Sequence, residues 1–259
     1  MKLVLRIGSH GLTDDKIIHT LASAVSDLVF TGHQVTIVHG GSDQLPAQVS
    51  SSSSHHHAGC AQHSTIDQCD AANKRLITIM RLAGLQALGL CGADANLAQT
   101  RKSPLENGTA APLEIVSVNP FWLRIIAAHQ GVSVLASVAL GPDGKFHVVD
   151  TDQLASVCAV HWKADVLIFL IRSEGIKTPD GLTLRWLNSR EIEALSSSSA
   201  LPSRLLSKLT ACQNALRHGV SRTRLLPFSH IESLSMFYSA RIDAGTEVVM
   251  SEVEGGKQK

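Results

Sequence analysis

Arg6 is a cation inside an apolar run, and glycines follow it. In LVLRIGSHG, residues 3–11, the apolar residues alternate as in a buried strand, and Gly8 and Gly11 mark the turn after it. A buried cation is costly unless it meets an anion. The backbone N–H groups of a glycine turn can also bind a phosphate. Arg6 therefore belongs either to an ordinary salt bridge or to a phosphate site, and this segment leaves both open.

Two further glycine turns follow predicted strands. Gly40 and Gly41 stand in VHGGSD, and Gly89 and Gly92 stand in GLCGAD. Glycine lets backbone amides approach an oxyanion, but it is also the ordinary residue of tight turns. None of the turns has the spacing of a Walker A loop or of a full GxGxxG motif. A P-loop or a Rossmann dinucleotide site is therefore not indicated.

Asp150 and Asp152 are two residues apart, where a predicted strand meets a predicted helix. On a strand, both carboxylates would face the same side of the sheet. Asp152 would then be a candidate partner for the buried Arg6. Alternatively, Asp150 caps the N-terminus of the helix that begins TDQLASVC, which is the interpretation we favour for Asp150.

Histidines and cysteines gather in one polar segment. Residues 46–66, PAQVSSSSSHHHAGCAQHSTI, are of low complexity, and we expect a flexible loop there. Imidazole and thiolate are zinc ligands, but the paired spacing of structural zinc sites is absent. We therefore predict a solvated loop and no metal site.

The elements that must position these residues alternate between strands and helices. Glycine after each of the first strands indicates βαβ units, and hence a mainly parallel sheet whose ligand sites lie at the carboxyl ends of its strands. The alternation predicts an α/β fold, a three-layer αβα sandwich around a mainly parallel sheet. We expect strands within residues 3–7, 33–39, 86–92, 109–119, 132–140, 141–150, 165–171, 223–229 and 245–250. We expect helices within 14–32, 72–85, 120–131, 151–164, 203–219 and 230–240, and a mobile connection at 195–203.

The composition excludes several classes of protein. The formal net charge of the 259 residues is +1, which favours neither nucleic acid nor an anionic membrane as a partner. The chain has neither a membrane-spanning apolar run nor a signal-peptide pattern. The five cysteines form no CxxC pair, which favours reduced thiols. We expect a cytoplasmic protein.

The order of the motifs is more specific than any one of them. LRIGS, VHGGS and GLCGADA occur in that order, and the later SKLTACQNALRHGV and GTEVV continue the pattern. Residues 3–250, except 48–66, resemble the amino acid kinase family, and within it the acetylglutamate kinases. The resemblance implies an amino acid kinase-like fold, with an N-lobe at 1–160 on the substrate side and a C-lobe at 161–259 on the nucleotide side. It also implies ATP-dependent phosphorylation of the side-chain carboxylate of N-acetylglutamate or a related small carboxylate, with Mg²⁺ carried by the nucleotide.

The same resemblance assigns roles to individual residues. It implies that two cations neutralise the phosphates while an aspartate orients them. The implied catalytic residues are Arg6, Lys208 and Asp152; the implied phosphoryl and substrate residues are Gly8, Gly40, Gly41, His63 and Asp150; the implied nucleotide residues are Arg172 and Gly175. It further implies a homodimer through the helix around Phe121 and Trp122.

Some positions depart from the family pattern. Arg6 replaces a lysine, Val148 replaces an asparagine, and Ile171-Arg172 replaces a threonine-aspartate pair. Arginine is a planar fork rather than a point charge, so the exchange at position 6 is not conservative. Two alternatives to an acetylglutamate kinase therefore stand beside it. One is a kinase with a changed acceptor, and the other is a catalytically lapsed ligand-binding or regulatory module.

Overall fold

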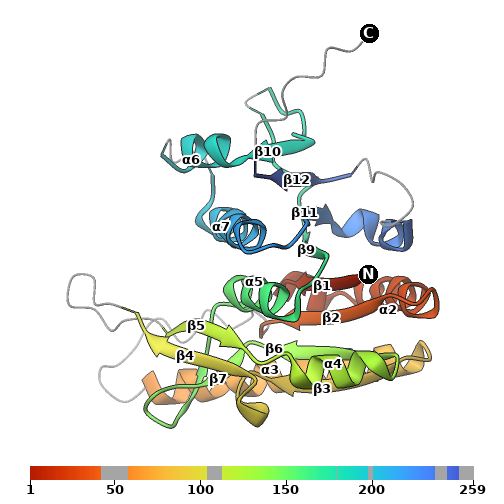
Figure 1. The fold of residues 1–259 in the computed structure, drawn as a ribbon, viewed down its shortest axis with the longest axis vertical. Helices are drawn as coiled ribbons and strands as arrows, with labels where there is room; N and C mark the ends of the chain where they lie inside the picture. Colours follow the sequence, from red (N-terminus) through yellow and green to blue (C-terminus); the bar gives the residue numbers. More distant parts are fainter. Residues whose placement is uncertain (42–57, 104–112, 179, 198–200, 237–243, 251–259) are drawn as a thin grey trace.

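An eight-stranded sheet forms the centre of the fold. The computed structural model describes residues 1–41, 58–103, 113–178, 180–197, 201–236 and 244–250. Figure 1 shows the sheet, whose strand order is β10-β12-β11-β9-β1-β2-β6-β3. Its strands are β1 (Lys2–Ile7), β2 (Gln34–His39), β3 (Gln86–Cys91), β6 (Gly131–Ala136), β9 (Val166–Ile171), β10 (Trp186–Asn188), β11 (Arg222–Pro227) and β12 (Thr246–Val249). Only the β11–β12 pair is antiparallel, which confirms the predicted mainly parallel sheet.

Helices cover both faces of this sheet. They are α1 (Ser9–Thr13), α2 (Asp15–Phe30), α3 (Ala58–Leu82), α4 (Phe121–Ala128), α5 (Thr151–Trp162), α6 (Ser189–Ser197) and α7 (Ser203–Arg217), with 3-10 turns η2 (Asp94–Asn96) and η3 (Phe228–Met236). Leu3, Leu5 and Ile7 of β1 pack into one apolar cluster with α2, α3 and η3. Val4 points the other way, into a cluster with α4, α5 and α7. The three-layer αβα sandwich is therefore confirmed.

The central position of β1 explains where Arg6 lies. Side chains alternate between the faces of a strand, so Arg6 shares the face of Val4, beneath α5 and α7. In the parallel pairing of β1 with β2, Ile7 lies opposite His39. The two strands therefore end level with each other, and the glycines that follow them leave the sheet at the same edge.

Several short elements were not predicted or were predicted wrongly. The predicted strand 132–140 is divided at Ser137 into β6 and β7 (Val138–Leu140), and β7 no longer pairs with the main sheet. β7 pairs with β8 (Phe146–Val148), and β4 (Ala98–Lys102) pairs with β5 (Leu113–Val118), each pair forming a separate two-stranded sheet. The predicted helix at 230–240 is the 3-10 turn η3, over its described part. β4, β10 and α6 have no counterpart in the prediction.

Two of the predicted glycine turns have a different structure. α1 begins at Ser9, so Gly11 lies inside a helix, where a Cβ would come 2.7 Å from the ring of Phe228. Gly89 lies within β3, where a Cβ would overlap the side chain of Asn73. Close packing, rather than anion binding, accounts for glycine at both positions.

The predicted loop 46–66 is wrong over its last part. α3 already begins at Ala58, and its apolar face runs through Cys69, Leu76 and Met80, which are all buried. The side chain of His63 and residues 42–57, which include the other histidines of this segment, lie outside the described residues. At the later serine-rich segment, α6 extends to Ser197 and α7 begins at Ser203, which leaves little of the predicted connection.

One sheet joins the two predicted lobes, because β1 of the first pairs directly with β9 of the second. The division at residue 160 remains a prediction. Among the described helices, none combines the length and apolar character that crossing a membrane requires. Cys69, Cys91, Cys158 and Cys212 are free thiols.

Candidate active site

Asp152 binds both of the predicted catalytic cations. Arg6 Nε lies 2.6 Å from Asp152 Oδ1, and Lys208 Nζ donates a 3.0 Å hydrogen bond to Asp152 Oδ2. The three residues come from β1, α5 and α7, so the cluster ties the central strand to both helices above it. Asp152 is only 5% exposed. Burying a carboxylate this deeply is costly unless cations face it, and here two cations do.

The Arg6–Asp152 contact is an ion pair rather than an aligned hydrogen bond. Within the described part of the chain, neither Arg6 Nε nor Asp152 Oδ1 has a hydrogen-bonding partner of good geometry, although the two atoms are close. The guanidinium extends toward the strand exit, since a Cβ on Gly8 would lie 2.7 Å from Arg6 Nη1. Gly8 therefore makes room for the arginine.

Gly40 and Gly41 are held close to two helices. A Cβ on Gly40 would lie 2.8 Å from Thr151 Oγ1 at the start of α5. A Cβ on Gly41 would lie 3.2 Å from Cys69 Sγ on α3. Thr151 Oγ1 in turn donates a 3.1 Å hydrogen bond to Ser137 Oγ. The backbone of this turn is thus packed where a larger residue would displace its neighbours.

All of these groups except Cys69 line one cleft at the carboxyl ends of the strands. Its volume is about 1070 Å³, at the upper end of the range for small-molecule sites. Except for His63, whose side chain lies outside the described residues, every predicted site residue lines it: Arg6, Gly8, Gly40, Gly41, Asp150, Asp152, Arg172, Gly175 and Lys208. Near His63, α3 contributes Thr65 and Gln68 to the lining.

Asp150 is the N-cap of α5. Its Oδ1 accepts a 2.7 Å hydrogen bond from Gln153 N. β8 ends at Val148, so Asp150 and Asp152 do not share a strand, and the condition under which both would face one side of the sheet is not met. The alternative interpretation, capping, is confirmed. Asp150 also lines the cleft, so both roles are open to it.

Arg172 and Gly175 lie beyond the end of β9, on the far wall of the cleft. Gly175 has a φ of +132°, a conformation that residues with a side chain rarely adopt. A Cβ there would also lie 2.6 Å from Thr183 Cγ2 and 2.8 Å from Thr246 Oγ1. The glycine thus lets this loop pass close to β12.

Several lining residues escaped prediction. Thr151 and Ser137 lie next to Gly40. Arg204 lies one helical turn before Lys208, and Lys208 Nζ donates a 3.3 Å hydrogen bond to Arg204 O. The sequence contained a signal for Arg204, because residues four apart share one face of a helix. Thr151 follows the capping Asp150 directly, but nothing in the sequence indicated its packing against Gly40.

The cleft carries an excess of positive charge. Its lining includes the five cations Arg6, Arg172, Lys177, Arg204 and Lys208, against the carboxylates of Asp150 and Asp152. Burial lowers the pKa of Lys208, and the nearby Arg6 guanidinium lowers it further, while Asp152 acts in the opposite direction. The lysine ammonium is therefore held in a site that would favour an added anion.

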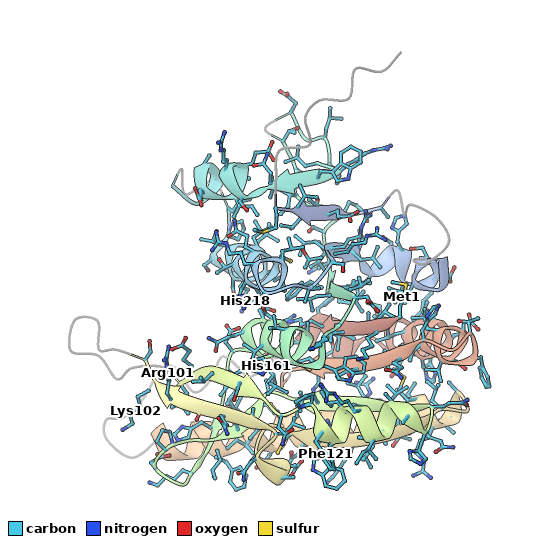
Figure 2. The ribbon with its side chains drawn as sticks, in the orientation of Figure 1. Met1, Arg101, Lys102, Phe121, His161 and His218 are labelled. Carbon is cyan, nitrogen blue, oxygen red and sulfur yellow. The ribbon has the colours of Figure 1, made fainter. Side chains whose placement is uncertain are left out.

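A second cavity, of about 880 Å³, lies between α5, α7 and β5. Figure 2 shows His161 on α5 and His218 at the C-terminal end of α7, just after its last residue, and both line the cavity. Of the predicted site residues, only Asp150 reaches this cavity. The predicted site residues therefore lie mainly in the larger cleft.

The described cleft residues leave few carboxylate oxygens open to a magnesium ion, so such an ion would be held mainly by the phosphates of a nucleotide. Both oxygens of Asp152 face cations, and Oδ1 of Asp150 accepts the capping hydrogen bond. Mg²⁺ prefers oxygen ligands and is commonly held by one or two carboxylates together with substrate phosphates. Here Asp150 Oδ2 is the carboxylate oxygen that would be available to such an ion.

Comparison with known proteins agrees with the geometry of the site. The model of the amino acid kinase family matches residues 1–226. An acetylglutamate kinase of Acidobacterium capsulatum is 36% identical, over 97% of this chain and 100% of that protein. A second, of Koribacter versatilis, is 33% identical, over 96% and 99%.

Solved structures agree on the fold. An N-acetylglutamate synthase from Neisseria gonorrhoeae, crystallised with coenzyme A and N-acetyl-glutamate, superposes with a TM-score of 0.79 at 20% identity. The match covers 96% of this chain and 59% of that one. The family match over residues 1–226 and the relatives at 33–36% identity show that the chain belongs to the amino acid kinase family.

Proposed function

We propose that this protein transfers the γ-phosphoryl group of ATP to the side-chain carboxylate of N-acetylglutamate or a closely related small carboxylate. The observation that carries the proposal is the bridge from Arg6 through Asp152 to Lys208, in a cleft that the Gly8 and Gly40–Gly41 turns also line. Relatives that are 33–36% identical over nearly their full length are acetylglutamate kinases, which supports the same acceptor.

In the proposed reaction, a carboxylate oxygen of the acceptor forms a bond to the γ-phosphorus as the bond to the ADP oxygen breaks. The products are ADP and an acyl phosphate, and no proton needs to move because the acceptor is already ionised. The protein therefore contributes position and charge rather than a base.

Each part of the site has a role in this reaction. Arg6 and Lys208 neutralise charge on the phosphoryl oxygens, and Asp152 orients both cations. The N–H groups of Gly8, Gly40 and Gly41 bind the phosphoryl and the acceptor carboxylate. We assign His63 and Asp150 to the acceptor, and Arg172 and Gly175 to the nucleotide, whose phosphates would carry Mg²⁺. We place the reaction in the cytoplasm and in arginine biosynthesis.

A kinase with a changed acceptor is the second candidate, and Val148 favours it. This residue lines the cleft with an apolar side chain that is 37% exposed, at a position where the resembling family has an asparagine. An apolar wall binds an acyl or alkyl group better than it binds a polar one. The acceptor would then differ in its N-acyl portion.

Hydroxylamine trapping distinguishes these candidates, because it converts an acyl phosphate to a coloured hydroxamate. Wild-type protein with Mg-ATP would be tested against N-acetylglutamate, glutamate, aspartate and their longer N-acyl forms. We expect hydroxamate in equal amount to ADP, and most with N-acetylglutamate. A different preferred acceptor would support the second candidate. ADP release that does not depend on any acceptor would contradict both.

We also propose that the protein is a homodimer through α4. Phe121 and Trp122 are 53% and 41% exposed, and their rings pack edge to face with their centroids 5.2 Å apart. Figure 2 shows Phe121 on the outer side of the molecule. Large exposed aromatic residues are typical of the centres of protein interfaces.

A further inference from the structure

His39 is a buried histidine directly before the Gly40–Gly41 turn, and the proposed reaction does not use it. Its side chain is fully buried at the end of β2. Nδ1 lies 2.9 Å from Gly40 O, and Nε2 lies 2.9 Å from Asn73 Nδ2 on α3. Both ring nitrogens therefore have a partner, one on the turn and one on the helix that packs beneath it.

These partners define a single tautomer. A carbonyl oxygen can only accept, so Nδ1 must carry the hydrogen and donate it to Gly40 O. The amide nitrogen of Asn73 can only donate, so Nε2 must be the acceptor. Burial lowers the pKa of His39 to about 4, which keeps the ring neutral at physiological pH.

Asn73 is itself fixed in place. Its Nδ2 also donates a 2.9 Å hydrogen bond to Val134 O in β6, the neighbour of β2. The glycine at position 89 of β3 leaves the space that the Asn73 side chain occupies. β6 and β3 therefore fix the orientation of the Asn73 amide, and this amide in turn fixes the orientation of the His39 ring.

The His39 ring controls the direction of one peptide plane. In a trans peptide, the C=O of Gly40 and the N–H of Gly41 lie in one plane and point in opposite directions. With Gly40 O bonded to the His39 ring, the Gly41 N–H must point away from that ring, and the Gly41 backbone also hydrogen-bonds to the Cys69 thiol of α3. On the other side of Gly40, Ser137 N donates a 2.9 Å hydrogen bond to His39 O and fixes the preceding peptide in the same manner.

We propose that His39, oriented by Asn73, is a positioning residue for the Gly40–Gly41 turn. It fixes the Gly40–Gly41 peptide and so holds the backbone of this turn beside the cleft, where the transferring phosphoryl group or the acceptor carboxylate would bind. This inference rests on the proposed phosphoryl transfer. Donors that are aligned before the reaction favour the transition state more than the ground state. Loss of the alignment therefore lowers kcat more than it raises KM.

The tautomer is tested without any activity measurement. Long-range ¹H–¹⁵N spectra of protein labelled in its histidines would be recorded at pH 7, and the His39 signals assigned as those missing from His39→Asn. We expect a protonated Nδ1 and a bare Nε2. A protonated Nε2, alone or together with Nδ1, would overturn the inference even if the enzyme is a kinase.

The positioning role is tested by a graded series of variants. His39→Leu removes the donor, and we expect kcat to fall about 10²-fold with KM for ATP changed less than about threefold. His39→Asn keeps a donor near the position of Nδ1, and we expect its kcat to be at least tenfold higher than that of His39→Leu. Thr36→Val, a buried change on the same strand but away from the turn, serves as the control and should keep wild-type kcat.

The outcomes separate this inference from the proposed function. Folded His39→Leu protein with wild-type kcat, or variants that lose only melting temperature, would contradict the positioning role. A wild-type protein that has the expected tautomer but forms no acyl phosphate would contradict the proposed function. In that case the inference is tested on the Gly41 amide resonance, which must shift in His39→Leu and stay in place in Thr36→Val.

Discussion

Neutralising Asp152 leaves two cations facing each other beneath α5 and α7. In Asp152→Asn, Arg6 and Lys208 lose the anion that lies 2.6 Å and 3.0 Å from them, while their side chains stay only 15% and 14% exposed. Breaking a buried ion pair by removing one partner typically costs about 3–5 kcal/mol of stability. For a chain of this size, about 2–4 °C of melting temperature corresponds to each kcal/mol, so we expect a decrease of about 6–20 °C.

Because this loss of stability comes from two buried cations without their anion, removing either positive charge should reduce it. Asp152 raises the pKa of Lys208 against the effect of burial, so without Asp152 the lysine loses its proton more readily. The variant should therefore recover part of its stability at high pH. Removing one of the cations as well, in Arg6→Met/Asp152→Asn, should be less destabilising than the sum of the two single changes.

Urea unfolding at pH 7, with melting temperatures on the same samples, measures these effects. Asp143→Asn is the matched control, because Asp143 also forms an ion pair, with His147 at 2.9 Å, but on the surface. Exposed pairs contribute little, so the control should unfold close to the wild-type midpoint. If Asp152→Asn also unfolds there, the bridge does not stabilise the fold and the reasoning is refuted.

Three further predictions concern pH and assembly. Because burial lowers the pKa of Lys208, the alkaline fall in activity should begin at a lower pH than the pKa of a free lysine. In Lys208→Arg this fall should be absent. The same alkaline fall in Lys208→Arg as in the wild type would contradict the assignment to Lys208. Because the pKa of His39 is about 4 in the folded protein and about 6.5 when exposed, the unfolded chain binds more protons between these values. The free energy of unfolding should then fall by about 3 kcal/mol from pH 6.5 to pH 4, a dependence that His39→Asn should flatten in urea titrations. Trp122→Glu should convert a dimer to a monomer in light scattering at micromolar concentration, and a wild-type monomer would refute the α4 interface.

The long elements could be predicted from the sequence because their patterns are unambiguous. DVLIFLI is apolar at nearly every position, as a strand covered on both faces must be, and it forms β9 near the middle of the sheet. The helical spacing in residues 14–32 gave α2 to within two residues at each end. The clustering of Arg6, Asp152 and Lys208 was expected because the whole order of motifs resembles one family.

The remaining elements could not be predicted, for physical reasons that differ. β4 (AQTRK) and β10 (WLN) lack the long apolar run that marks a buried strand. β4 pairs only with β5, and β10 lies at the edge of the sheet, so neither strand is covered on both sides. Gly89 resembled a turn glycine, but its absent side chain makes room for Asn73, a contact between residues distant in sequence. The role of His39 depends on the same contact and was equally hidden.

The most direct test of the proposed site is to measure turnover and melting temperature on one sample of Arg6→Ala. Asp152 keeps its bond to Lys208 in this variant, so we expect a smaller loss of stability than in Asp152→Asn. We expect acyl phosphate formation to fall by about 10²-fold or more, as when one charge-stabilising group is lost. Arg6→Lys should retain part of the activity. A folded Arg6→Ala protein with undiminished phosphoryl transfer would contradict the account.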